Sequence, residues 1–73
     1  MIERIQTLYA NVYDKQKFIE SVAIRLEKVP GTLKSHWFSG FFSVPEKYHS
    51  VVIEMLESVV KEQIEQLNKL FEI

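Results

Sequence analysis

The stretch Val22–Phe38 constrains the fold most strongly, because two short amphipathic segments flank a sharp turn within it. Apolar residues keep to one helical face over 15–28, which predicts a first helix. Pro30 ends that helix, since proline disfavours helical geometry in the residue before it, and its own fixed φ suits the start of another helix. A second helix is predicted over 31–39, with Gly40 as its C-cap.

The end of the chain predicts one long helix. Ser43 and Glu46 have the spacing of a capping box, so this helix is expected to begin near Ser43 and to run over 43–73 without a Gly or Pro beyond its first turn. Its apolar arc is broad at first and then narrows to a stripe with an approximate a/d rhythm. We expect this narrow part to join copies of the chain through Val60, Ile64, Leu67, Leu70 and Phe71. The alternative that it packs back on the first helix stays open.

The first twelve residues fit either a helix or a strand. The apolar positions Ile2, Ile5, Leu8, Tyr9 and Val12 recur every three or four residues, as in an amphipathic helix, but β-formers are also frequent. With a helix here, the sequence predicts an all-α domain of about four helices that spans 1–73. A domain this small gains little burial from its own core, so self-association would add stability.

Composition limits the function classes further. The chain has no cysteine, which excludes thiolate metal sites, and its N-terminus lacks the apolar core of a secretory signal, so we expect a cytoplasmic protein. No apolar run approaches the roughly 20 residues that span a bilayer. The net charge is −1, but residues 1–40 hold six Lys and Arg against four acids, whereas 41–73 hold three against six. The basic excess therefore coincides with the two short helices.

Several residues together resemble the helix-turn-helix DNA-binding domains of phage and bacterial regulators of the repressor, Cro and CII type. They are Ala23-Ile-Arg-Leu26, Val29-Pro-Gly-Thr-Leu-Lys34, Trp37 and Ser43-Val-Pro-Glu46. The resemblance covers about residues 15–60, with 15–39 as the helix-turn-helix core. Where that family has a glycine and then an aliphatic residue after the first helix, this chain has Glu27 and Lys28. We therefore expect Pro30-Gly31 to take over the turn.

The resemblance implies that the second helix enters the major groove of double-stranded DNA. The positions that would face bases or nearby phosphates are Thr32, Lys34, Ser35 and His36. The positions that would contact the phosphate backbone are Lys15, Lys17, Arg25 and Lys28. Leu33, Trp37, Ala23 and Leu26 would be core.

No other chemistry is indicated. The two histidines lack partners at metal-ligand spacing, and the chain has none of the common catalytic motifs, so we expect neither a metal, a cofactor, a small-molecule substrate nor an enzyme. The aromatic residues at 37–38 and 41–42 could form a platform that stacks on nucleic-acid bases, but core packing is the favoured interpretation. The alternative function is an all-α protein–protein interaction or assembly module.

Overall fold

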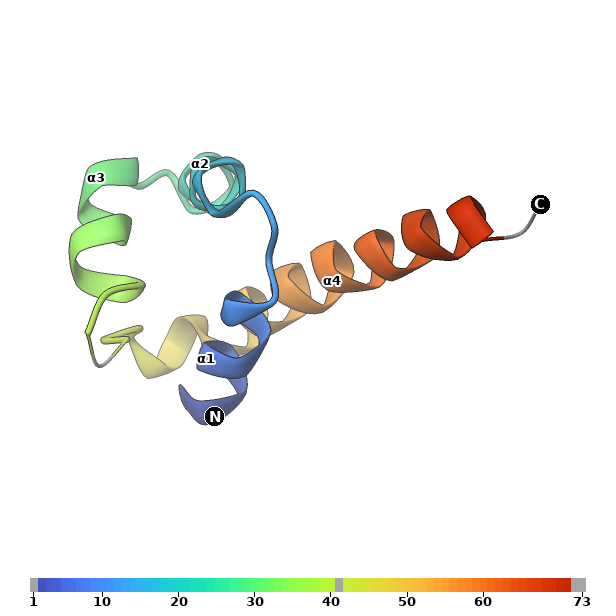
Figure 1. Ribbon diagram of the computed structural model, residues 1–73. Helices are drawn as coiled ribbons and strands as arrows, with labels where there is room; N and C mark the ends of the chain where they lie inside the picture. Colours follow the sequence, from blue (N-terminus) through green and yellow to red (C-terminus); the bar gives the residue numbers. More distant parts are fainter. Residues whose placement is uncertain (1, 41, 72–73) are drawn as a thin grey trace.

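The computed structural model describes residues 2–40 and 42–71, and every regular element in them is helical. The elements are α1 (Ile2–Ala10), α2 (Lys15–Leu26), α3 (Pro30–Thr32), η1 (Leu33–Trp37), η2 (Glu46–Tyr48) and α4 (His49–Phe71). In Figure 1, α1, α2 and α3 gather around the beginning of α4, and the rest of α4 extends away from them. The all-α class and the long C-terminal helix are confirmed, and residues 2–10 are helix rather than strand.

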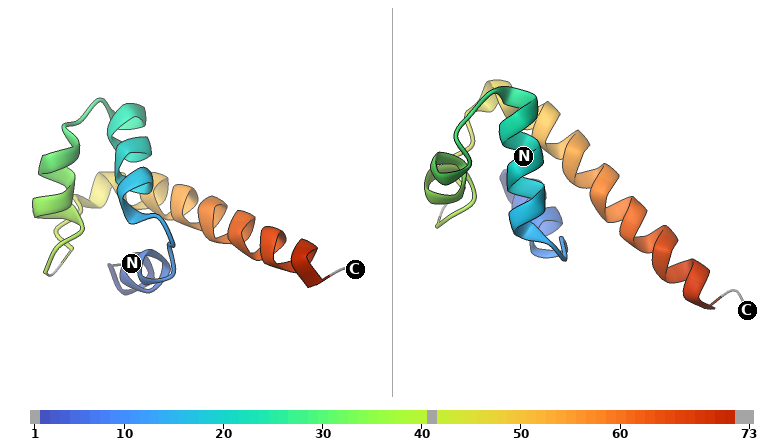
Figure 2. Two further views of the ribbon diagram at one scale, coloured as in Figure 1. Left: turned by 45° about the horizontal axis from the view of Figure 1, so that its top comes forward. Right: turned by 90° about the horizontal axis from the view of Figure 1, so that it is seen from above.

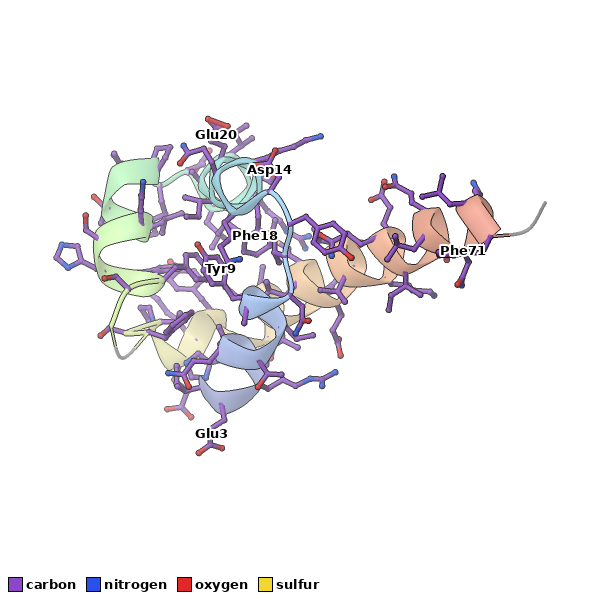
Figure 3. All side chains as sticks on the ribbon, in the orientation of Figure 1. Glu3, Tyr9, Asp14, Phe18, Glu20 and Phe71 are labelled. Carbon is purple, nitrogen blue, oxygen red and sulfur yellow. The ribbon has the colours of Figure 1, made fainter. Side chains whose placement is uncertain are left out.

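The helices α1 and α2 bury the faces that their apolar spacing predicted. Asp14 begins α2, where its carboxylate accepts a hydrogen bond of 3.0 Å from the Lys17 backbone N–H. Between the helices, the Tyr9 ring stacks on Phe38 with centroids 4.9 Å apart and also contacts Phe18. Figure 3 shows Tyr9 and Phe18 directed into this space. Burial raises the pKa of the Tyr9 phenol, because the charged form is desolvated there.

The turn after α2 is made by Glu27, not by Pro30-Gly31 as expected. Glu27 adopts the left-handed conformation with φ 55°, and its N–H bonds back to the last turn of α2, as does the Lys28 N–H, which donates to the Ala23 carbonyl at 2.9 Å. Gly31 lies within α3 and has no positive φ. This conformation costs a residue with a Cβ about 1–2 kcal/mol, so the turn adopts its left-handed residue although that residue is a glutamate and not a glycine.

Two predicted boundaries were wrong. The second short helix ends at Trp37 rather than Ser39, because its last five residues form a π-helix whose C-cap is Phe38. Gly40, with φ 59°, lies two residues further on and belongs to the following turn.

The last helix does not begin near Ser43, because Val44 is buried before it and Pro45, with ψ 139°, is not helical. The Ser43 N–H instead bonds to the His36 carbonyl at 3.2 Å, and the helix begins at Glu46 as a 3-10 turn. Residues 72–73 of the predicted helix lie outside the described residues.

The two halves of α4 differ in what they contact. In residues 49–63, Val52 and Leu56 are fully buried, and Glu57 forms an ion pair of 2.9 Å with Arg4. Gln63 closes this packed half: its Oε1 accepts from the Tyr13 N–H and its Nε2 donates to the Asn11 carbonyl, both at 2.9 Å. Residues 64–71, here called the free half of α4, extend beyond the other helices in both views of Figure 2. The molecule is consequently elongated, at 42 × 22 × 19 Å.

Candidate nucleic-acid interface

The segment α3–η1 is held by two anchors and exposes the residues between them. Leu33 is fully buried, and Trp37 is buried against Phe38 and against the Tyr48 ring, whose centroid lies 5.2 Å away. The four residues predicted to face bases are all exposed on this short segment, and we call them the polar face: Thr32, Lys34, Ser35 and His36. All four predicted base-facing residues are therefore accessible to solvent.

A feature that the sequence did not reveal is the π-helical geometry of this segment. The Phe38 N–H donates to the Leu33 carbonyl at 3.0 Å, five residues back, so the turn that carries Lys34, Ser35 and His36 is wider than an α-helical turn. Such π turns are rare and are frequent at functional sites. Apolar spacing alone does not separate a π turn from an α turn over so short a segment.

The four predicted phosphate-contacting residues are all exposed. Lys15 donates to the Val12 carbonyl at 2.9 Å, and Lys28 lies over the Tyr48 ring at 5.2 Å from its centroid. Lys17 lines a hollow of about 370 Å³ between α2 and α4, which Glu62 also lines. Arg25 lines a second hollow between the same helices, of about 230 Å³ and also lined by Glu54. These contacts lie along α2 and at its two ends, and the phosphate-contacting role of the four residues stays a prediction.

A second exposed surface lies at the other end of the molecule. The apolar side chains of the free half of α4 stay accessible, with exposed fractions of 52% for Ile64, 39% for Leu67, 68% for Leu70 and 84% for Phe71. We call these four residues the apolar stripe. Val60, predicted to belong with them, is partly buried and packs against the core. Figure 3 shows Phe71 far from the other labelled side chains.

The buried histidine and the aromatic residues near η1 are part of the packed core. His49 is buried, with its Nε2 at 2.8 Å from the Val44 carbonyl oxygen. Trp37 and Phe38 are buried, and Phe42 packs on Phe38 and Tyr9, so these three residues belong to the core rather than to a stacking platform. Phe41 lies outside the described residues.

Two further features are absent from the described residues. Within 2–40 and 42–71, no three His, Cys, Asp or Glu side chains form a group that could hold a metal ion. None of the helices in the same part of the chain combines the length and apolar character needed to cross a membrane.

The chain matches no protein-family model, no curated protein and no solved structure. The polar face and the apolar stripe, which lie at opposite ends of the molecule, are the two surfaces available to a partner.

Proposed function

We propose that this chain binds double-stranded DNA through the polar face of α3–η1, as a small non-enzymatic regulator of the helix-turn-helix kind that it resembles. The observation that carries the proposal is the exposure of Thr32, Lys34, Ser35 and His36 on a segment whose other side is anchored by buried residues. A second helix that is anchored on one side and polar on the other suits insertion into a major groove. The left-handed turn at Glu27, which sets the direction of α3, also supports it.

Each residue of the polar face has a role in this proposal. Lys34 donates to guanine O6 and N7, the acceptors that Lys and Arg prefer in the major groove. Thr32 and Ser35 hydroxyls bond to bases or to the adjacent phosphates, and His36 lies at the edge of the contact. We assign no base contact to Lys15, Lys17, Arg25 and Lys28, which are exposed along α2 and at its ends. The positive charge that Lys34 brings into the groove is expected to displace about one or two counterions per copy.

Selection from a random pool of duplex DNA tests this proposal most broadly. The expected result is enrichment of a short motif that contains guanine. The same selection with Lys34→Ala is expected to lose that guanine, whereas Arg25→Ala serves as the matched control and is expected to retain the motif. A pool that stays random with the wild-type chain contradicts sequence-specific binding.

A second candidate function is supported by the apolar stripe on α4. Surfaces of this kind mark protein contacts more often than nucleic-acid contacts, because DNA offers few apolar groups. In this candidate the chain is an all-α interaction or assembly module, and the α2–turn–α3 unit serves only to pack the core. The two candidates are compatible, since a regulator that binds DNA as a homo-oligomer needs both surfaces.

A further inference from the structure

The apolar stripe on the free half of α4 exposes an unusually large apolar area to water, which indicates a binding surface. Its four side chains expose roughly 500 Å² per copy, which is near the upper end of the largest patches that monomeric proteins carry. Their neighbours Gln66 and Asn68 are uncharged. At 100° per residue, the charged residues of this part of α4 lie on the opposite side of the helix; they are Lys61, Glu62, Glu65 and Lys69. The stripe is thus suited to a partner that also presents an apolar face.

The packed half of α4 limits how long that partner can be. Leu56, Val60 and Gln63, which contact the other helices, lie on the same side of α4 as the stripe. A helix that covers the stripe therefore meets the loop 11–13 when it reaches Gln63, since Gln63 holds that loop through Asn11 and Tyr13. The available length is residues 64–71, or about 12 Å of helix.

We propose that the partner is a second copy of this chain, with the free halves of the two α4 helices packed antiparallel. The free half of a second copy has the required length, because it consists of the same residues 64–71. A parallel arrangement fails, because the packed domains protrude on the side of α4 that carries the stripe and would occupy the same space. An antiparallel arrangement places the two domains at opposite ends of the paired helices. Figure 2 shows the free half projecting away from the other helices.

The antiparallel pairing makes the stripe complementary to itself. With the two-fold axis between positions 67 and 68, Ile64 of one copy lies level with Phe71 of the other, and the two Leu67 side chains meet at the centre. The charged sides of both helices face solvent, so no like charges are forced together. The antiparallel helix dipoles add a favourable term. About 1,000 Å² would be buried in total if the stripe is fully covered, which is at the low end for specific interfaces, so we expect a weak dimer whose population depends on concentration.

This inference does not rest on DNA binding; it rests on the second candidate function and names its partner. Sedimentation equilibrium of the full chain, from about 5 to 500 µM, tests the pairing in the absence of DNA. The wild-type chain is expected to pass from monomer to dimer over this range. Leu67→Lys is expected to raise the dissociation constant at least about tenfold, because it buries two unpaired ammonium groups at the axis. Ile24→Lys is the matched control and is expected to dimerise normally, since Ile24 is an exposed apolar residue of α2.

Cysteine cross-linking then tests the antiparallel geometry, because the chain has no native cysteine. Leu67→Cys is expected to form a disulfide with the same residue of a second copy. Ile64→Cys and Phe71→Cys are expected not to cross-link alone, since equivalent positions lie about 10 Å apart along the axis, but to cross-link when mixed. Circular dichroism of each variant verifies that the helices are retained.

Two outcomes would overturn the inference in different ways. A chain that stays monomeric at all concentrations removes the second copy as partner. A dimer in which Ile64→Cys and Phe71→Cys each cross-link to themselves removes the antiparallel geometry but leaves the assembly function. A flat DNA titration with an intact antiparallel dimer removes the DNA proposal and leaves this one standing.

Discussion

The polar face of α3–η1 and the apolar stripe of α4 are both exposed, yet they are built in opposite ways. The polar face lies on a segment that Leu33 and Trp37 fix to the core, so the backbone that carries its hydrogen-bonding side chains is held in place. The apolar stripe lies on the part of α4 that extends beyond the core, and it consists of large side chains that carry no polar group. A fixed polar surface suits a partner that is read by hydrogen bonds, whereas an exposed apolar surface suits a partner that removes it from water.

The largest effect is expected on the free energy of unfolding, which should depend on the residues below the polar face and not on the residues of the apolar stripe. Leu33→Ala removes a fully buried side chain below the polar face and is expected to destabilise the fold by about 2–5 kcal/mol. Leu70→Ala, in the exposed stripe, is expected to stay within about 0.5 kcal/mol. Urea unfolding monitored by circular dichroism, at concentrations below dimer formation, measures both. Equal losses in the two variants would show that the stripe is covered within one copy.

The second prediction concerns the chemistry of the polar face. Lys34→Ala is expected to weaken binding to the selected DNA by about 1–3 kcal/mol, or roughly 5- to 150-fold, because a base contact is lost. Arg25→Ala removes a cation that lies between α2 and α4 and is expected to change affinity by less than about twofold. Fluorescence anisotropy with a labelled duplex measures the ratio. An Arg25 effect as large as that of Lys34 would move the interface to α2.

A smaller effect is expected at Gln63, where α4 leaves the core. Gln63→Ala removes hydrogen bonds to the Tyr13 N–H and the Asn11 carbonyl and is expected to cost about 1 kcal/mol. Hydrogen exchange of the Tyr13 amide is expected to accelerate. Gln66→Ala, one turn further along α4, is the control and should alter neither quantity. Unchanged exchange at Tyr13 in Gln63→Ala would mean that the loop 11–13 does not depend on α4.

The smallest effect is expected at the turn that sets the direction of the polar face. Glu27→Gly is expected to stabilise the chain by about 0.5–1 kcal/mol, since glycine adopts a positive φ without the clash that a Cβ makes. Glu20→Gly, within α2, should instead destabilise it by about 1 kcal/mol. Thermal unfolding of both variants compares the two positions directly. A destabilised Glu27→Gly would indicate that the glutamate side chain itself supports the turn.

Much of the fold followed from apolar spacing, because spacing reports which face of a helix is covered. It identified Leu33 and Trp37 as core and the stripe on α4 as an apolar face. Apolar spacing could not identify which partner covers a helix face. Val60 was therefore grouped with the exposed residues of the apolar stripe, although it packs against the core. The capping-box pattern at Ser43 misled for a related reason, since the burial of Val44 takes the backbone away from helical geometry before Pro45.

The candidate site was harder to predict than the fold. The basic residues near the second helix were grouped by their nearness in sequence, but residues a few positions apart on α2 face different neighbours. Lys28 interacts with the ring of Tyr48, twenty positions away, and nothing local to Lys28 indicates that contact. Glu27 carries no signal of a left-handed turn, since the usual residue there is glycine or asparagine.

The salt dependence of DNA binding tests the central claim most directly. If the polar face binds DNA through Lys34, the logarithm of the association constant should fall linearly with the logarithm of salt concentration, with a slope of about −1 to −2 per copy. Lys34→Ala should reduce that slope by about 1. No detectable binding at low salt, or a slope that Lys34→Ala leaves unchanged, would contradict the claim.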